Sequence, residues 1–313
     1  MSTFTRRSRL HTLVVSVRRN WGLLVLLLPA VIFALIFMYR PMAGILIAFK
    51  DYKPAKGIFG SPWTSQNGLK YFNMFFDTYN CWSVIWNTIS LSLYTLIAGF
   101  PIPIMFALLL NQTQHLRFKK VVQTVTYAPH FISMVVLVGI MRILLAPSSG
   151  LVNLAIAALG GEKLMFLTDP NWFRHLYVWS GVWQNTGWDS IIYIAALASV
   201  SPELHEAATV DGASRFQRIL YVDLPSIIPT AVTLLILNTG KVMTVGFEKV
   251  YLMQTSLNLS ASEVLSTYIY KIGLINGQFS LSTAVNLFNS LVNLMMLVIV
   301  NFISRKLTET SLW

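Results

Sequence analysis

The sequence contains few charged residues and almost no cysteine. Only 11% of its 313 residues are charged, whereas 55% are hydrophobic, and the mean hydropathy is +0.62. This balance excludes a soluble globular domain. Cys81 is the single cysteine, which excludes an internal disulfide and a metal site built on cysteine spacing. The five histidines are scattered and form no ligand pair, so we expect no metal site.

Acidic residues are the scarcer charged class, with 12 Asp and Glu against 23 Lys and Arg. The basic residues alternate with apolar stretches and form no basic groove with interleaved aromatics, so we expect no nucleic-acid partner. A phosphate-binding loop of the form GxxxxGK[ST] is also missing. The nearest fragment, residues 239–242, lacks the first glycine and the hydroxyl residue. We therefore expect the chain to bind no ATP, magnesium or other cofactor itself.

Long apolar stretches dominate what is present, and about 20 apolar residues suffice to cross a bilayer. Pro101 and Pro103 predict a kink in the second stretch, which a helix bundle tolerates. The first stretch is longer than a signal-peptide core and is followed by no small-residue cleavage site, so we interpret it as a retained helix. We predict an all-α integral membrane protein with six transmembrane helices, near residues 21–39, 80–114, 121–145, 175–198, 224–246 and 279–302.

The basic residues indicate the orientation of these helices. They gather before the first stretch, between the second and third, between the fourth and fifth, and after the sixth. By the positive-inside rule these four segments, including both termini, are cytoplasmic. We accordingly predict a cytoplasmic N-terminal segment over 1–20, a transmembrane domain over 21–304 and a cytoplasmic tail over 305–313. The basic residues concerned are Arg6, Arg7, Arg9, Arg18, Arg19, Arg117, Lys119, Lys120, Arg215, Arg218, Arg305 and Lys306.

A polar insert, SPELHEAATVDGASRFQRILYVDLPS over residues 201–226, separates the fourth and fifth apolar stretches. Ser201 is a good helix cap, with Pro202 at the first helical position and Glu203 near the positive helix end. Gly212 permits a turn, after which residues 213–220 predict a second short amphipathic helix. Two short helices bent at a glycine form a compact knob, and we infer that a partner docks there.

The spacing within this insert resembles the cytoplasmic coupling loop of ABC importer permeases. Glu206-Ala207-Ala208 is followed after three residues by Gly212, and after nine more by Val222, Asp223 and Leu224-Pro225. The one departure is Val222 in place of the usual isoleucine. The runs at 184–197, 245–253, 265–268 and 301–306 are similar to the carbohydrate branch related to maltose-type permeases. Within that branch they resemble permeases for complex, often acidic oligosaccharides, over roughly residues 15–310.

The resemblance implies a type I ABC importer permease architecture in a bacterial cytoplasmic (inner) membrane. It implies a second homologous permease subunit, an extracytoplasmic sugar-binding protein and a dimeric ABC ATPase that carries ATP and magnesium. The loop over 201–225 would seat in a cleft of the ATPase, and Glu206 would pair there with a basic side chain. The coupling residues implied are Glu206, Ala207, Ala208, Asp211, Gly212, Leu224 and Pro225.

Polar side chains within the apolar stretches suggest a substrate path, because such residues usually face the bundle interior or a wet cavity. The alternative is that they only hydrogen-bond between helices. Arg142 and Lys241 fall in the outer halves of their stretches, which favours an anionic sugar such as a uronate-containing alginate or pectin fragment. The predicted path residues are Arg142, Trp183, Asn185, Trp188, Asn238, Lys241, Asn286, Asn289 and Asn293.

Other functions stay open from the sequence. A permease of the same type for a neutral sugar or another solute would carry the same loop. An ion-coupled carrier would be active without an ATPase. An enzyme would need titratable groups clustered at one membrane depth, whereas Asp189, Arg142 and Lys241 lie on different stretches. We therefore expect a transport subunit and not an enzyme.

Overall fold

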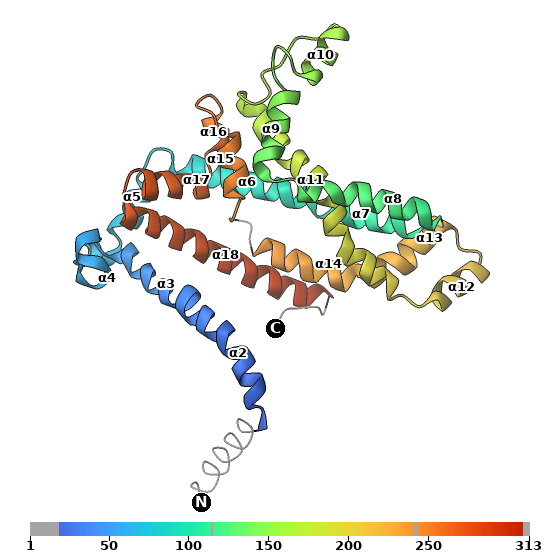
Figure 1. Cartoon of the computed structure of the whole chain (residues 1–313), viewed down its shortest axis with the longest axis horizontal. Coiled ribbons are helices and arrows are strands. Elements are labelled where there is room, and N and C mark those ends of the chain that lie inside the picture. Colours follow the sequence, from blue (N-terminus) through green and yellow to red (C-terminus); the bar gives the residue numbers. More distant parts are fainter. Residues whose placement is uncertain (1–18, 114, 241–242, 309–313) are drawn as a thin grey trace, which may run out of the picture. The chain divides into compact units, whose positions relative to one another are not determined.

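The computed structural model describes residues 19–113, 115–240 and 243–308 and is drawn in Figure 1. The chain divides into two compact units, residues 1–71 and residues 72–313, which we describe one at a time. Within the described ranges the structure is helical, and its β structure is one isolated bridge between Lys50 and Trp63. The predicted path residue Lys241, most of the N-terminal segment and the end of the tail lie outside the described residues.

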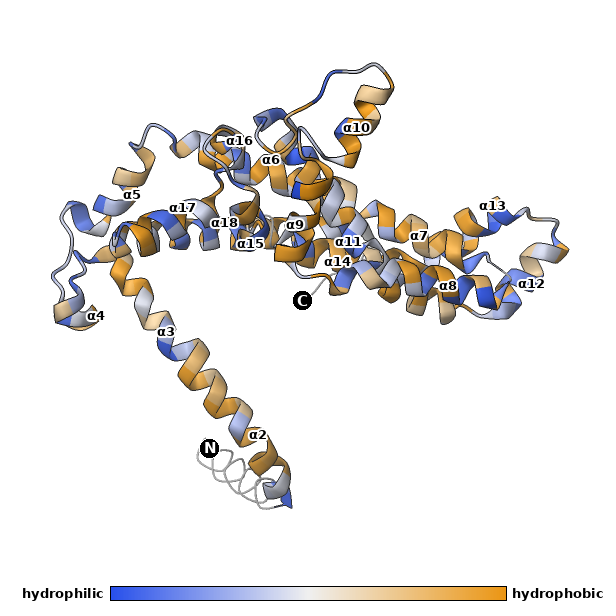
Figure 2. Ribbon diagram, turned by 45° about the horizontal axis from the view of Figure 1, so that its top comes forward, coloured by the Kyte–Doolittle hydropathy of each residue, from blue (hydrophilic) through white to orange (hydrophobic). Residues whose placement is uncertain are grey.

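The first unit begins with one helical segment, Trp21–Phe49. None of the 18 residues in its most apolar stretch is buried. It consists of α2 (Trp21–Ala34), the π turn η1 (Leu35–Tyr39), α3 (Arg40–Met42) and the 3-10 helix η2 (Ala43–Phe49). Figure 2 shows that hydrophobic residues cover α2 on all sides. A helix that is apolar all round and exposed fits a lipid environment. The helical segment continues ten residues beyond the predicted end of the first span.

The rest of the first unit is a short folded segment over residues 50–71. It contains η3 (Pro54–Lys56), α4 (Gly57–Gly60), η4 (Gln66–Gly68) and the start of α5 (Lys70–Phe76). Lys50 Nζ donates to the carbonyls of Ile58 and Phe59 at 2.9 and 3.2 Å. Lys70 Nζ and Tyr71 Oη both donate to Asp51 Oδ1 at 2.7 Å. These side-chain bonds hold a segment that has little regular structure of its own.

The second unit is a set of packed helices and short helical turns. Pro101 and Pro103 follow the break between α6 and α7, where the sequence predicts a kink. The elements are α6 (Cys81–Gly99), α7 (Pro101–Asn111), α8 (Leu116–Tyr127), η5 (Ala128–Phe131), α9 (Met134–Leu144), α10 (Leu151–Ala158), α11 (Pro170–Ala198), α12 (Pro202–Val210), α13 (Arg215–Arg218), η6 (Ile219–Asp223), α14 (Leu224–Thr239), α15 (Phe247–Met253), α16 (Leu259–Ser262), α17 (Leu265–Tyr270), η7 (Lys271–Ile275) and α18 (Phe279–Thr308).

The predicted third span is not one straight helix. Leu116–Phe131 and Met134–Leu144 meet at an angle of 99°. Pro129 lies in the 3-10 turn before the break, and Ser133 has an extended backbone (φ −65°, ψ 153°) and caps α9. Proline lacks the N–H that would continue the helical hydrogen bonding. A serine that caps the next helix with its side chain favours a new helix start. An apolar count along 121–145 does not register either signal, so the predicted third span gave no indication of this bend.

Four helical segments of the described chain are long and apolar enough to cross a membrane, or five if the bent pair forms one span. These four are Trp21–Phe49, Cys81–Asn111, Arg215–Thr239 and Phe279–Lys306. The predicted fourth span corresponds to α11, which has 29 residues but is not among them. It carries Arg174, Gln184, Asn185 and Asp189 along its length, and these lower its apolar character.

Helix α11 lies at the centre of the second unit and packs against α6, α7, α8 and α14. Figure 1 shows α18 running alongside α14, and these two helices are also in contact. One buried cluster joins Leu91, Leu137, Phe173 and Val250, and a second joins Ala107, Tyr193, Leu197 and Ile227. Gly187 brings α11 against the α8 backbone, because a Cβ there would lie 2.2 Å from the Thr126 carbonyl oxygen. The central helix thus packs on several neighbours, while Trp179, Trp183 and Ile192 on it stay about half exposed.

Candidate functional site

The polar insert folds into the predicted knob. Helix α12 begins at Pro202, and the Ser201 hydroxyl accepts the N–H of Glu203 at 3.3 Å, as the sequence predicts. The helix ends at Val210, Gly212 follows with a left-handed φ of +76°, and the Ala213 N–H donates to the Ala208 carbonyl at 2.9 Å. Glycine adopts this conformation without a Cβ penalty. Ser214 then starts α13 with a reciprocal cap to Gln217.

The second half of the knob differs from its prediction. Residues 213–220 were expected to form a separate short helix before a span starting at 224. Instead, α13 continues through the π turn η6 into α14, so one helical segment runs from Arg215 to Thr239. A π turn shifts the hydrogen-bond register just before Pro225, which has no N–H to donate. The predicted fifth span therefore begins nine residues earlier, inside the knob.

The knob presents apolar side chains to its surroundings. Leu204, Val210 and Phe216 are exposed by 55%, 87% and 71%, respectively. Glu206 and Asp211 are also exposed and form no ion pair within the described chain. Ala207 and Ala208 of the same helix add only small side chains, and α12 carries both hydrophilic and hydrophobic residues (Figure 2). Exposed apolar groups rimmed by acids are typical of a protein interface.

A buried carboxylate connects the knob to the helices behind it. Asp223 is fully buried and accepts hydrogen bonds from Gln112 Nε2 at 2.6 Å and Asn111 Nδ2 at 3.3 Å. His205 Nε2, on α12, lies 3.3 Å from the same carboxylate. This one side chain therefore joins α12, the end of α7 and the start of α14. Asp223 is absent from the predicted coupling residues. A signal for it exists in the sequence, because burying an acid at the start of a span costs free energy unless hydrogen-bond partners compensate for it.

Two cavities lie along α11, where it faces α6 and residues 245–249. The larger has a volume of about 340 Å³ and is lined by Tyr177, Gln184, Asn185 and Lys249 among others. The second has about 290 Å³ and is lined by Thr95, Asn238 and Thr244 among others. Asp189 and Tyr177 line both. Amide, carboxylate and aromatic groups on apolar walls make a lining suited to a polar organic ligand.

The structure brings only part of the predicted path together at these cavities. Asn185 and Asn238 line them, and Asn185 Oδ1 lies 2.9 Å from His130 Nδ1. Trp188 is adjacent and stacks on the His130 ring, with centroids 4.4 Å apart. Trp183 is 55% exposed on α11 and lines neither cavity.

The remaining predicted residues lie elsewhere. Arg142 Nη2 donates to the Leu252 carbonyl at 2.7 Å and lines a separate cavity of about 270 Å³. Asn293 bonds to the Met243 N–H and to Thr244 Oγ1. Asn286 is exposed and Asn289 is buried on α18, and neither lines the two cavities along α11. Asn293 thus fits the alternative of a packing hydrogen bond, since it ties α18 to residues 243–244.

Lys249 is a cavity residue that the sequence analysis missed. Its side chain is only 5% exposed, and its Nζ donates to the Tyr177 carbonyl at 2.8 Å and lies 4.8 Å from the Tyr177 ring centroid. Among the described residues it forms no ion pair. The run 245–253 resembles the carbohydrate branch of the permeases. Lys249 itself follows the fifth predicted span, and no pattern around it predicts that its side chain is buried.

No group of three or more His, Cys, Asp and Glu within the described ranges could hold a metal ion. The site therefore consists of a docking knob, a buried carboxylate behind it and polar cavities beside the central helix. This combination couples a surface contact to the interior of a helix bundle.

Comparison with known proteins shows which family the chain resembles. The family model for "binding-protein-dependent transport system inner membrane component" matches residues 82–309. Protein LplB of Bacillus subtilis (strain 168) is 40% identical over 300 residues, which cover 96% of this chain and 93% of the relative. The polygalacturonan/rhamnogalacturonan transport system permease protein YteP of the same organism is 41% identical over 310 residues, covering 99% and 95%.

A solved structure is also similar over nearly the whole chain. It is the crystal structure of a bacterial alginate ABC transporter in complex with an alginate pentasaccharide-bound periplasmic protein. The TM-score is 0.87 at 39% sequence identity, and the match covers 95% of this chain and 98% of that one. From these matches and the fold, the chain belongs to the family of binding-protein-dependent transport system inner membrane components, and it is a multi-pass membrane transport subunit.

Proposed function

We propose that this chain is one permease subunit of an ATP-driven importer that takes up acidic oligosaccharides, such as alginate or pectin fragments, from an extracytoplasmic binding protein. The similarity to a polygalacturonan/rhamnogalacturonan permease and to an alginate transporter, both near 40% identity, supports this substrate class. Lys249, a buried cation on the wall of the larger cavity with no ion-pair partner in the described chain, supports an anionic cargo.

The knob is the observation that carries the proposal. Its exposed side chains offer an apolar docking surface, and Glu206 forms no ion pair with any residue that the structure describes. The ATPase dimer would receive this surface in a cleft, with a basic group facing Glu206. Closure of the dimer would move α12, and Asp223 would transmit that movement to α7 and α14 through its bonds to Asn111 and Gln112. Such transmission needs a two-state element, which the nucleotide on the ATPase biases.

The rest of the assembly follows from the same proposal. A second homologous permease would complete the pore, and six spans with cytoplasmic termini would place the knob on the ATPase side. In that orientation the cavities along α11 would open toward the outside when ATP closes the dimer. The polar groups there would then receive sugar from the binding protein.

The test is uptake by the full transporter, with both permeases, the ATPase and the binding protein, in liposomes. We expect ATP-dependent uptake of alginate or oligogalacturonate oligomers. Glu206→Gln should lower uptake at least tenfold, whereas Glu203→Gln, which removes an acid from the same helix, should not. Uptake of neutral maltooligosaccharides only would contradict the substrate class. Uptake by this chain without an ATPase would instead support an ion-coupled carrier.

A further inference from the structure

A third cavity lies further along the same two helices and contains an unneutralised cation. It has a volume of about 470 Å³ and is lined by Ser90 and Tyr94 of α6, by Ala261, and by the first turns of α11, including Arg174 and His175. Tyr94 is followed directly by Thr95, and His175 closely by Tyr177, both of which line the two cavities described above. The three cavities are therefore lined from neighbouring turns of α6 and α11.

Arg174 is poorly satisfied within the chain. Its Nη2 donates to Asn87 Oδ1 at 2.9 Å, and its buried Nε has no hydrogen-bond partner. No carboxylate of the described residues forms an ion pair with it. A guanidinium carries five N–H donors and suits a carboxylate, which accepts two of them side by side. Arg174 is partly buried and has one amide acceptor in the described chain, so its guanidinium keeps donors and a positive charge with which it can bind an anion.

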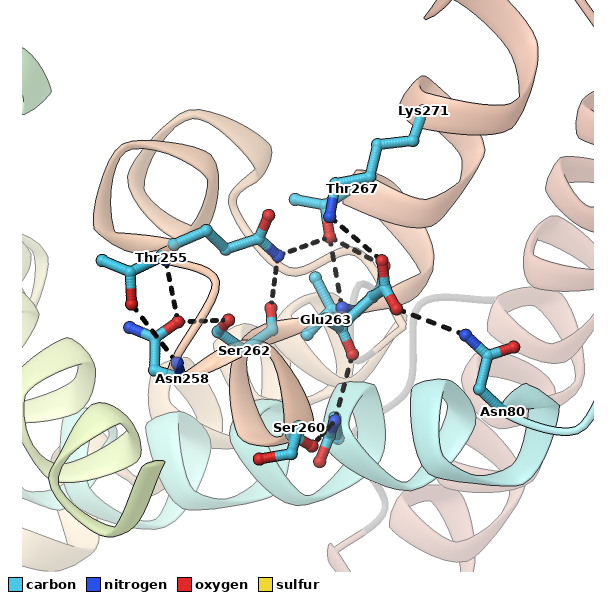
Figure 3. A network of polar contacts seen from close by, with 11 residues as sticks. Asn80, Thr255, Asn258, Ser260, Ser262, Glu263, Thr267 and Lys271 are labelled. Atoms are coloured by element: carbon cyan, nitrogen blue, oxygen red, sulfur yellow. Dashed lines mark hydrogen bonds and ion pairs between the residues drawn. The ribbon is translucent and has the colours of Figure 1, made fainter. Parts of the chain in front are cut away.

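Two acids lie near Arg174, Glu263 in the fold and Asp169 in the sequence, and both already bind other groups. Figure 3 shows Glu263 at the centre of a polar network, where its Oε1 lies 3.0 Å from Lys271 Nζ and its Oε2 accepts from Asn80 at 3.3 Å. Asp169 caps α11 by accepting the Asn171 N–H at 2.9 Å. The positive charge of Arg174 is therefore left for a ligand.

The same network fixes the position of the Arg174 acceptor. Asn87 Nδ2 donates to the carbonyls of Ser260 at 2.8 Å and Glu263 at 3.1 Å, which leaves its Oδ1 facing Arg174. Asn87 is 3% exposed. Because both ends of this amide are bonded, the guanidinium is held by a rigid support rather than by a mobile surface group.

Tyr94 and His175 bring aromatic and hydrogen-bonding groups to the cavity wall, and Trp179 bonds to Tyr94 beside it. Trp179 Nε1 donates to Tyr94 Oη at 2.9 Å, and Tyr94 Oη lies 2.9 Å from His175 Nδ1. While Tyr94 Oη accepts from Trp179, its own proton is free to go to His175 Nδ1, and in the tautomer that accepts it His175 Nε2 carries an N–H that can donate. A sugar ring offers hydroxyl acceptors for that N–H and an apolar face for the aromatic rings.

We infer that this cavity is a subsite that binds the carboxylate of a uronate residue through Arg174, ahead of the cavities that contain Asp189 and Lys249. The inference rests on the proposed function and adds the residue that distinguishes charged from neutral sugars. Trp179 and Tyr94 would support the ring, and His175 Nε2 would bond to a hydroxyl.

The experiment compares uptake of an oligogalacturonate with uptake of its methyl ester, which has equal length but no charge. The full transporter in liposomes is used throughout. The binding protein is the same in every assay, so its own preference cancels when a variant's acid-to-ester ratio is divided by that of the unmodified transporter. Arg174→Gln should lower this ratio roughly tenfold or more. Arg174→Lys, which keeps the charge but loses the paired donors, should lower it less.

Lys163→Gln is the matched control. It removes one positive charge from an exposed segment that does not line the cavity, and it should leave the ratio unchanged. An unchanged ratio in Arg174→Gln, with uptake of acid and ester reduced equally, would overturn the inference and assign Arg174 to the support of Asn87. A failure of the unmodified transporter to take up either form would overturn the proposed function, and the inference with it.

Discussion

At the scale of single residues, Asp223 is the side chain on which most contacts of the knob converge. Its two oxygens accept from Gln112 and Asn111, and His205 lies within 3.3 Å. Asn111 and Gln112 lie at the end of α7, whereas His205 belongs to α12. Loss of the carboxylate would leave the partly buried groups of Asn111, Gln112 and His205 without this acceptor, which is costlier than losing one exposed hydrogen bond.

Asp223→Ala should therefore destabilise the purified chain by about 2 kcal/mol, because an unsatisfied buried group costs that order of free energy. The measurement is thermal unfolding in detergent. Ser226→Ala is the matched control, since Ser226 bonds only to the Asp223 carbonyl and is exposed. Equal midpoints for the two variants would contradict the role of the Asp223 carboxylate.

Asp51 predicts a pH dependence in the segment over residues 50–71. Hydrogen bonds from Lys70 and then from Tyr71 hold the pKa of Asp51 below its ordinary value. A carboxyl group whose pKa is depressed by folding stabilises the fold above its unfolded pKa, and this stabilisation is lost as pH falls through the folded pKa. The segment should therefore loosen at pH values below about 4.

Hydrogen exchange of residues 50–71, corrected for the intrinsic effect of pH, measures this change. Asp51→Asn should exchange fast at neutral pH and lose the acid-induced difference. Asp77→Asn replaces an exposed acid outside the segment and should keep the difference. Protection that does not vary between pH 3 and 7 in the unmodified chain would speak against the Asp51 contacts.

The chemistry of several site residues could be predicted from the sequence, but their positions could not. Ser201 as a cap and Gly212 as a turn follow from local rules, because each acts on its own helix. Arg174, Lys249 and Asp223 depend on which helix lies opposite, and no spacing along the chain encodes that. Arg142 illustrates the reverse case: its charge was noticed, but its guanidinium bonds to the Leu252 carbonyl, away from the cavities along α11.

At the scale of elements, the knob depends on a backbone conformation as well as on contacts. Gly212→Ala should strain the turn by roughly 1–2 kcal/mol, because an L-residue pays this cost at left-handed angles. We expect the variant to fold but to lose ATPase stimulation by the loaded binding protein. The readout is ATP hydrolysis by the assembled transporter with and without that protein.

Gly160→Ala provides a control with the same kind of strain. Gly160 has φ +83°, and, as at Gly212, a Cβ there would meet no atom within 4 Å. It lies between α10 and α11, far along the chain from the knob. If both variants reduced stimulation equally, general instability and not the turn of the knob would be the cause.

Helix boundaries show why the element scale is only partly predictable. Apolar length located α6 with α7, α14 and α18 to within about ten residues, because lipid-facing helices are long and uniform. It did not predict the 99° bend between α8 and α9, which lies between Pro129 and the capping Ser133. Apolar length also placed the start of the fifth span at residue 224. In the structure α13 and η6 are continuous with α14, so the helical segment starts within the knob.

At the scale of the whole molecule, the proposed orientation can be tested with single cysteines. Cys81 is buried, so the unmodified chain should react slowly with a membrane-impermeant maleimide. Val210→Cys and Leu159→Cys introduce thiols at positions exposed by 87% and 89%. In intact cells we expect labelling at 159 only, and in inside-out vesicles at 210 only. The opposite pattern would reverse the topology inferred from the basic residues.

The central helix α11 has one more consequence, for the way the protein is made. A segment that carries Arg174, Gln184, Asn185 and Asp189 partitions poorly into hydrocarbon on its own. Its neighbours α6, α7 and α8 precede it in the chain, whereas α14 follows it. During synthesis α11 must therefore wait at the translocation site, or leave it already packed on helices made earlier. The residues that shape its cavities also make its entry into the membrane a cooperative step.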